Sequence, residues 1–283
     1  MEIESVNTLV KEIDKEIIIN AQKHFDSLIK PVGSLGKLET MITSYAGAEK
    51  CYDPKLLDYP SRTVLAFLEE GNKIMPLDDS APLKILTDAV GGKIVVEEIK
   101  SSCRITDALN LGEKLTVKEI KSGCKLIAPI AFGRYVVPSG WERLKKQEPK
   151  EILETLGSPI CAALVGSIIT AAENEVQIML DGLATIMAAY IAIKIAPNVK
   201  EYCICSQLTT EKGQGEILEE LEFSPLLKLQ FKEGNGCGAA LGFGLFDAGL
   251  KAYKEMETFA QAGVHDEMEE FSHAKEENKR SKK

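Results

Sequence analysis

An alternation of strand-like and helix-like segments, beginning at Pro149, limits this chain to few architectures. Segments rich in β-branched residues between turn residues are typical of strands, and apolar positions at a spacing of three or four are typical of helices. The segments are, in order, a small-residue helix at 159–173, strand VQIML (176–180), a helix at 183–195, strand EYCICS (201–206), a helix near 214–222 and a helix from about Cys237. This order predicts a mainly parallel sheet covered by helices, with ligands bound at the carboxyl ends of the strands.

The N-terminal half fits the same architecture. RTVLAFL (62–68) and KIVVEEI (93–99) read as strands with a helix between them, and residues 2–29 and the stretch from about Lys37 as helices. We therefore predict an α/β protein, with a Rossmann-like sheet and a small helical domain built from the N- and C-terminal segments. The predicted divisions are residues 1–50 for the N-terminal helices of the small domain, 51–250 for the large domain, 251–265 for a C-terminal helix joining the small domain and 266–283 for a charged tail.

Composition excludes several function classes. The 283 residues carry a formal charge of −9, which gives no electrostatic footprint for nucleic acid or an anionic membrane. The longest uncharged apolar run, 159–172, is too short to span a bilayer, and the N-terminus lacks the apolar core of a signal peptide, so we expect a cytoplasmic protein. Seven scattered cysteines without a CxxC pair indicate reduced thiols. Cys203 and Cys205 should share one face of a strand, and no structural metal is expected.

Three stretches are candidates for a site. KPVGSLGKLE (30–39) either joins two helices or turns Lys30 and its backbone amides toward an anion. Asp181, at a strand end, is expected to cap the following helix. The glycines of EGNGCG (233–238) permit close backbone approach at the start of a helix, where negative charge is favoured. DG (181–182), SQLTTEKGQ (206–214) and this turn should lie on one face.

Together and in this order, these stretches resemble the CobT family of nicotinate mononucleotide:base phosphoribosyltransferases. KPVGSLGKLE is similar to the family's KPPGSLGRLE. The central segment from EILETLGSPICAALVG to DGLATIMAAYIAI and the C-terminal GCGAALGFGLFDAGLKAYKEMETFAQAGV, similar to GTGAALAL…NEMATFAEAGV, also match. The resemblance covers residues 14–265 and is densest at 149–264. It implies a reaction in which an aromatic base attacks C1′ of nicotinate mononucleotide and nicotinate departs, giving the lower-ligand α-ribotide of a cobamide. No cofactor is implied.

The resemblance also locates the family's general base, a carboxylate in a GEGTGAAL turn. Ungapped alignment places Gly234 on the first glycine, Gly236 and Gly238 on GTG, and Asn235 on the catalytic glutamate. An amide cannot take a proton at neutral pH. Glu233, two residues earlier, is the alternative base if the turn is remodelled. The resemblance therefore assigns no catalytic residue in this chain. Substrate-binding or cross-interface roles are implied for Lys30, Ser34, Gly36, Asp181, Gly182, Gly234, Asn235, Gly236 and Gly238.

Other departures point the same way. The family's phosphate-binding GEMGIGNTT is absent after LTVKEIKSGCKLIA (115–128), and GRYVVPSGWERLKK follows where the family has GRGTGLDDEGLARK. FLEEGNK (67–73) replaces FAADHG, and Gln207-Leu208-Thr209 replaces His-Arg-Ser. Altered site segments within a retained fold predict a supporting subunit, similar to the ArsB-like chain of the heterodimeric nicotinate mononucleotide:phenol phosphoribosyltransferase, with a catalytic CobT-like paralog as partner. Two alternatives stay open: a self-sufficient homodimeric transferase that uses Glu233, and a non-enzymatic ligand-binding or regulatory protein.

Overall fold

A single parallel sheet forms the centre of the molecule. The computed structural model describes residues 10–71, 78–132 and 141–263. Its strands lie in the order β2-β1-β3-β4-β5, and every neighbouring pair is parallel, which confirms the predicted α/β sheet. The strands are β1 (Ser61–Glu69), β2 (Lys93–Ile99), β3 (Cys124–Phe132), β4 (Gln177–Leu180) and β5 (Cys203–Cys205).

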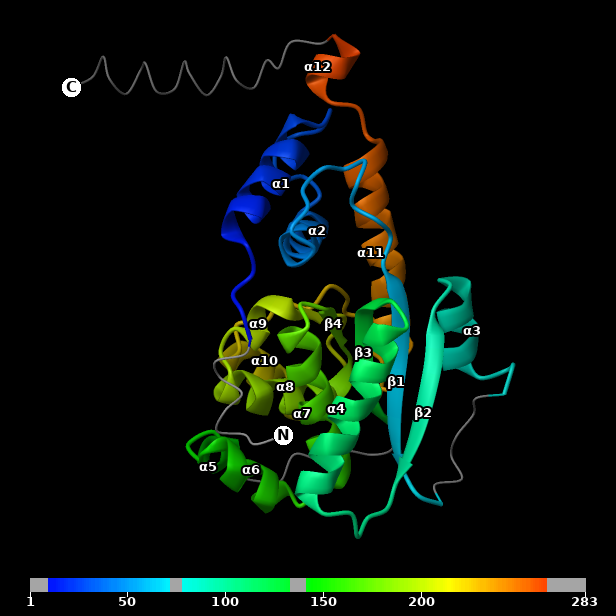
Figure 1. Cartoon of the computed structure of the whole chain (residues 1–283), viewed down its shortest axis with the longest axis vertical. Coiled ribbons are helices and arrows are strands. Elements are labelled where there is room, and N and C mark those ends of the chain that lie inside the picture. The colour runs from blue at the N-terminus through cyan, green and yellow to red at the C-terminus, as the bar shows by residue number, and fades with distance from the viewer. Residues whose placement is uncertain (1–9, 72–77, 133–140, 264–283) are drawn as a thin grey trace, which may run out of the picture.

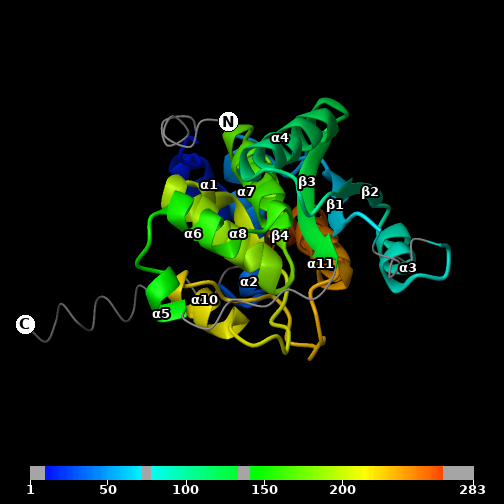
Figure 2. The ribbon, with the colours of Figure 1, turned by 90° about the horizontal axis from the view of Figure 1, so that it is seen from below.

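Helices cover both faces of the sheet because the inner strands are apolar on both sides. Leu65 and Phe67 of β1 pack with α4, α7 and α8, whereas Val64 and Ala66 pack with α2 and α11 on the opposite face (Figures 1 and 2). The helices are α1 (Lys15–Ser27), α2 (Lys37–Ala48), α3 (Pro82–Ala89), α4 (Ile105–Lys121), α5 (Trp141–Leu144), α6 (Pro149–Leu156), α7 (Pro159–Glu173), α8 (Gly182–Ile195), α9 (Val199–Tyr202), α10 (Gln214–Glu220), α11 (Cys237–Glu255) and α12 (Phe259–Ala262).

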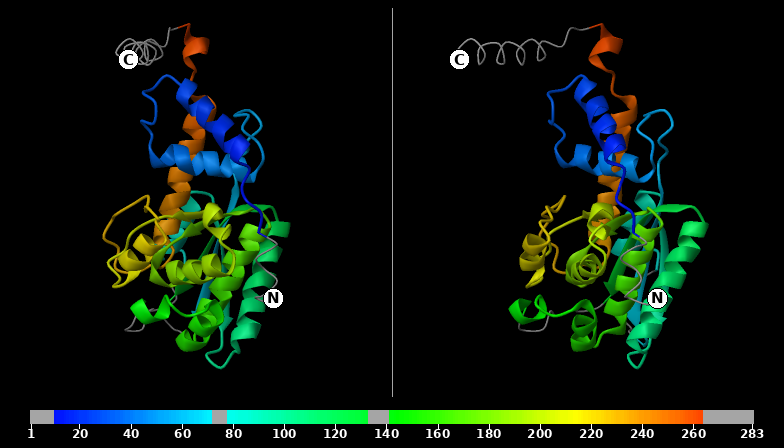
Figure 3. Two further views of the ribbon diagram at one scale, coloured as in Figure 1. Left: turned by 90° about the vertical axis from the view of Figure 1, so that its left-hand side faces the viewer. Right: turned by 60° about the vertical axis from the view of Figure 1, so that its left-hand side comes forward.

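The N- and C-terminal parts of the described chain meet at one end of the molecule. There α1 and α2 lie beside the C-terminal half of α11, which runs away from the sheet (Figure 3). The rings of Phe25 and Tyr253 are 4.8 Å apart, and the Ile29 amide donates to the Glu257 carbonyl. The predicted boundary at residue 250 falls within the continuous helix α11. The division into two domains stays a prediction.

Two predicted elements are wrong in part. Within the described chain, the helix expected over residues 2–29 begins at Lys15, since Asp14 accepts hydrogen bonds from the Glu16 and Ile17 amides as its N-cap. Residues 10–13 are instead held by α9, where Glu201 accepts from the Ile13 amide, and residues 1–9 lie outside the described chain. The strand expected at 201–206 begins at Cys203 because Glu201 and Tyr202 end α9.

Two further expectations concern cysteines and membranes. The seven cysteines all lie within the described ranges and none is in a disulfide. Cys203 and Cys205 pack on the same side of the sheet, as predicted. None of the helices in the described part of the chain has both the length and the apolar character that crossing a bilayer requires. The cytoplasmic location stays a prediction, and the predicted charged tail at 266–283 lies outside the described residues.

Candidate functional site

The carboxyl ends of β4 and β5 bring together the three stretches that the sequence placed on one face. Asp181 follows β4, residues 206–214 follow β5, and the turn at 233–238 leads into α11. Hydrogen bonds link all three, through Asp181 to the turn and through Glu211 to both the turn and α8. The site is therefore built where a parallel sheet usually binds its ligand.

Asp181 does not cap the helix that follows it, contrary to the sequence prediction. It occupies the N-cap position of α8, but its side chain accepts no hydrogen bond from that helix. Instead, the Gly236 and Gly238 amides donate to its Oδ2 at 2.9 and 3.1 Å, and Gln207 Nε2 donates to its Oδ1 at 2.9 Å. The carboxylate of Asp181 thus caps α11, a helix that begins more than fifty residues later.

Burial raises the affinity of the Asp181 carboxylate for a proton. The residue is 1% exposed, and desolvation raises its pKa to about 6, although the hydrogen bonds from Gln207 and the turn amides oppose this shift. Both carboxylate oxygens are occupied by donors, so Asp181 has no free oxygen to present to a substrate. The structure gives it the role of an internal anion at the start of α11.

Glu211 is a site residue that the sequence did not single out. Its Oε2 accepts from the Leu183 amide at 3.0 Å, from the Gly234 amide at 3.1 Å and from the Thr209 hydroxyl at 2.9 Å. One carboxylate oxygen therefore caps α8 and holds the glycine turn against it. Its place in the polar run SQLTTEKGQ, which follows β5, is the only sequence signal that could have indicated this role.

The glycines of the site are required by close backbone approach. A Cβ on Gly234 would lie 2.1 Å from the Gly182 Cα, and a Cβ on Gly236 would lie 2.6 Å from Ile130 on β3. A Cβ on Gly238 would lie 2.3 Å from Gln207 Nε2 and would displace that side chain from Asp181. Gly182 and Gly236 also have φ values of +79° and +89°, which L-residues with a side chain rarely adopt.

The two candidate side chains of the turn, Asn235 and Glu233, differ in their contacts. Asn235 Oδ1 accepts from the Cys237 amide at 3.3 Å, so its side chain folds back onto the first residue of α11. The Glu233 side chain is exposed, and within the described chain it forms no hydrogen bond or ion pair. Burial, together with the negative charges of Asp181 and Glu233, raises the pKa of the Cys237 thiol to about 11, so this thiol is protonated at neutral pH.

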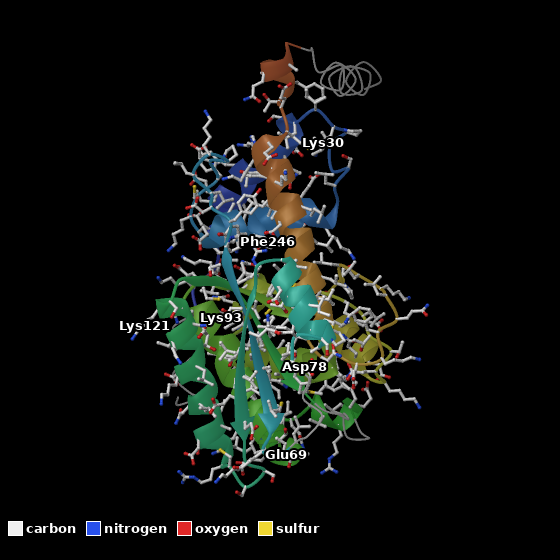
Figure 4. The ribbon with its side chains drawn as sticks, turned by 90° about the vertical axis from the view of Figure 1, so that its right-hand side faces the viewer. Lys30, Glu69, Asp78, Lys93, Lys121 and Phe246 are labelled. Atoms are coloured by element: carbon white, nitrogen blue, oxygen red, sulfur yellow. The ribbon has the colours of Figure 1, made fainter. Side chains whose placement is uncertain are left out.

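Figure 4 places Lys30 near the end of α11 that is farthest from this turn. Ser34 and Gly36 follow Lys30 in the same loop. Lys30 Nζ lies 5.7 Å from the Phe25 ring centre, beside Tyr253, which is about 24 Å along α11 from Cys237. Lys30 Nζ also forms a buried ion pair with Glu39 at 2.8 Å. Ser34 and Gly36 are exposed. Within one chain, no hydrogen bond among the described residues joins this loop to the glycine turn, although Lys37 Nζ at the end of the loop donates to the Pro225 carbonyl beside β5.

The described residues contain no cluster of side chains suited to bind a metal ion. Across the three described ranges, no group of three or more His, Cys, Asp or Glu side chains is arranged to hold a metal ion. Parts of FLEEGNK and GRYVVPSGWERLKK, at 72–77 and 133–140, lie outside the described residues, so the predicted loss of a phosphate loop stays a prediction.

Comparison with known families gives a match over about two thirds of the chain. The family described as phosphoribosyltransferase (DBI_PRT) matches residues 10–67 and 133–264. Two similar curated proteins are named nicotinate-nucleotide–dimethylbenzimidazole phosphoribosyltransferase. The one from Citrifermentans bemidjiense is 36% identical over 43% of this chain and 35% of its own length, and the one from Vibrio cholerae is 35% identical over 46% and 38%. The matched region thus spans little more than a third of these relatives.

Solved structures agree on the fold. A crystal structure of CobT from Thermus thermophilus superimposes with a TM-score of 0.72 over 89% of this chain and 99% of that chain, at 21% identity. A second structure from the same organism, of its nicotinate-nucleotide–dimethylbenzimidazole phosphoribosyltransferase, gives a TM-score of 0.74 at 22% identity and the same coverage. At this identity the likeness concerns the fold alone.

Proposed function

Because this chain belongs to the CobT family of phosphoribosyltransferases, we propose that it takes part in phosphoribosyl transfer from nicotinate mononucleotide to an aromatic nucleophile. We propose further that it acts as the supporting subunit of a heterodimer, whose CobT-like partner supplies the catalytic carboxylate. The product would be the lower-ligand α-ribotide of a cobamide, with a phenol or an azole as nucleophile. This function rests on the family match and on the chemistry of the turn.

The observation that carries the supporting role is the state of residues 233–238. In the reaction, the bond from C1′ to the nicotinate nitrogen breaks, nicotinate leaves with the electron pair, and the nucleophile bonds to C1′ while losing its proton to a base. Asn235 cannot accept that proton, and its oxygen is already bonded to the Cys237 amide. Asp181 is buried with both oxygens occupied.

The gap in the family match supports the same conclusion. Residues 68–132, which include β2, α4 and β3, are outside the match, although their strands take their places in the sheet. The scaffold is thus kept while the family's sequence signature is lost around the ends of β1 and β3. A subunit that serves only in assembly needs the scaffold but not the catalytic residues, and this chain fits that description.

Glu233 supports a second candidate, a self-sufficient homodimeric transferase that acts on dimethylbenzimidazole. Its carboxylate is exposed and lies two residues from the position of the family's base. If the turn rearranged so that Glu233 took the position of Asn235, the hydrogen bond from the Cys237 amide to Asn235 would break. Gly234 would also move away from Glu211, which its amide now contacts. The network around the turn therefore favours the supporting role.

The test is to co-express this chain with a full-length paralog that carries GEMGIGNTT and GEGTGAAL. Nicotinate release from nicotinate mononucleotide is then measured with phenol and with dimethylbenzimidazole, for each chain alone and for the complex. We expect turnover by the complex and none by this chain alone. Glu233→Gln in this chain should leave turnover of the complex within about twofold, and Asn235→Glu should not create a second active site, because a base acts only on reactants already held in geometry.

Three results would overturn the proposal. Turnover by this chain alone at the rate of the complex would show a self-sufficient enzyme. A hundredfold loss from Glu233→Gln in a correctly assembled complex would make this chain the catalyst. Separate monomers of the two proteins after mixing, measured by light scattering, would remove the heterodimer and leave a binding or regulatory protein.

A further inference from the structure

The two edge strands of the sheet differ in whether another segment of the chain pairs with them. Beyond β5, the chain's own segment at 226–227 continues the ladder, since the Leu226 amide donates to the Cys205 carbonyl and the Leu227 amide to the Ser206 carbonyl, both at 2.9 Å. At the other edge, β2 is paired with β1 alone among the residues that the structure describes. An open edge strand is a template for pairing with another chain.

The β2 strand is long and apolar enough to use that edge. It spans seven residues, all in register with β1 from Thr63↔Lys93 to Glu69↔Ile99. Ile94, Val95 and Val96 are only partly buried, whereas the residues of β1 beside them are fully buried. On the neighbouring helix α3, Ile85 is 53% exposed. Apolar surface is therefore left uncovered along this side of the molecule.

The side chains of β2 divide by alternation into two faces. Lys93, Val95 and Glu97 share the face of α4, where Lys93 Nζ contacts the buried Glu119 at 2.8 Å. Ile94 and Val96 share the other face, with the α11 cluster. Across the described chain, Glu97 has no ion-pair partner, and Lys93 is 56% exposed with donors to spare. These two charges lie two residues on either side of Val95.

We propose that β2 pairs antiparallel with β2 of a second copy of this chain, around a twofold axis at Val95. In this register Val95 lies opposite Val95 of the other copy. Ile94 then lies opposite Val96 of the other copy, and Lys93 lies opposite Glu97 of the other copy. Every pair except the central one occurs twice, as an isologous contact requires. Opposite charges and apolar residues directly across an antiparallel pair are the stabilising combinations.

Other registers lack this match. An axis at Val96 would place Glu97 opposite Val95 and Glu98 opposite Ile94, so that four carboxylates faced apolar residues. An axis at Ile94 would remove Glu97 and Glu98 from the strand overlap. The pairing at Val95 joins two five-stranded sheets into one continuous ten-stranded sheet. It is independent of the proposed enzymatic function and leaves the turn at 233–238 and loop 30–39 free for another partner.

Disulfide trapping tests the register directly. Val95→Cys places one new thiol opposite itself across the axis, so mild oxidation should give a covalent dimer that reduction reverses. Glu98→Cys is the matched control, because in this register its two copies lie about 20 Å apart. The seven native thiols are present in both variants and in the wild type, which corrects for their background. Equal trapping of both variants, or trapping of neither, would overturn the proposal.

A charge change provides a second readout without cysteine. Glu97→Lys puts lysine opposite Lys93 twice and should raise the dimer dissociation constant by about tenfold or more at low salt, measured by sedimentation. Glu98→Lys makes the same charge change beside it, opposite Gly92 of the other copy, and should have an effect within about twofold. Lys93 itself is left intact because it neutralises Glu119. Equal effects of the two variants, with folds checked by circular dichroism, would contradict the register.

Discussion

Asp181 combines complete burial with a carboxylate on which a distant helix depends. Its pKa is raised from 3.8 to about 6, mainly by desolvation. The folded protein therefore binds the proton more tightly than the unfolded chain does. This favours the folded state at low pH, and the contribution is lost as the pH rises through about 6. Above that pH the ionised carboxylate lowers the free energy of unfolding by on the order of 3 kcal/mol relative to its value at low pH, where the group is protonated.

Asp181→Asn should remove this cost and keep the cap. The asparagine oxygen can accept from the Gly236 and Gly238 amides, and its NH₂ group would face Gln207. Gln207 Oε1 is buried and has no hydrogen-bond partner among the described residues, so a turn of that amide supplies the acceptor. At about pH 7.5 the variant should unfold with a free energy equal to or above that of the wild type, and this advantage should shrink toward about pH 5.

Asp181→Ala is the contrasting variant. It leaves the Gly236 and Gly238 amides without their acceptor, which should lower the free energy of unfolding by about 2 to 4 kcal/mol at both pH values. Urea denaturation at a series of pH values measures all three proteins. An identical loss for the asparagine and alanine variants, or a difference between Asp181→Asn and wild type that does not change with pH, would contradict this assignment.

At the scale of elements, two carboxylates organise the starts of two helices. Asp181 caps α11 and Glu211 caps α8, so each helix is fixed by a residue from another segment. Glu211→Gln keeps one acceptor oxygen, whereas Glu211→Ala leaves the Leu183 and Gly234 amides unpaired. We expect the alanine variant to lose about 1 to 3 kcal/mol of stability and the glutamine variant clearly less.

Hydrogen exchange locates this effect. In Glu211→Ala the Gly234 and Leu183 amides should exchange at least about tenfold faster than in the wild type, while the core of α7 is unchanged. Glu219→Ala on the exposed face of α10 is the matched control and should alter neither amide. Unchanged protection of Gly234 in Glu211→Ala would show that the turn is held by the glycine contacts alone.

Most elements could be predicted because their signals are local. The β-branched run at 93–99 and the small-residue run at 159–173 form β2 and α7 with the predicted bounds. The strand at 201–206 was predicted too long, because Glu201 and Tyr202 have strand-like neighbours but are held in a helical turn beside residues 10–13. The roles of Asp181 and Glu211 could not be read from local patterns, since their partners depend on which strand ends are adjacent.

Over the whole molecule, α11 joins two regions with separate chemistry. Its first turn lies at the carboxyl ends of the sheet, and its last turns lie among α1, α2 and loop 30–39. The resemblance to known transferases indicated that both regions carry functional motifs, but a sequence cannot show that about 24 Å of helix separates them. If Lys30 and the glycine turn serve one reaction, as proposed here, Lys30 of one chain must act on the site of another, whereas Lys37 at the other end of the loop donates to the Pro225 carbonyl beside β5 of its own chain.

The last prediction separates that role from a structural one. Lys30 neutralises Glu39, and these side chains are only 6% and 3% exposed, so Lys30→Met should cost about 3 to 5 kcal/mol by leaving a buried charge. Changing both residues, as Lys30→Met with Glu39→Gln, should restore most of that stability. If Lys30 only balances Glu39, the double variant should also restore turnover of the proposed heterodimer.

If Lys30 instead reaches the partner's site, the double variant will melt like the wild type and still lose at least about tenfold in turnover, and this is the result we expect. Ser34→Ala offers an independent check, because Ser34 is exposed and its change should leave stability within about 0.5 kcal/mol. Its heterodimer should nevertheless lose more turnover than that of Glu233→Gln. The measurements are steady-state nicotinate release and thermal melting for each complex. Full turnover by both the double variant and Ser34→Ala would show that loop 30–39 serves folding alone.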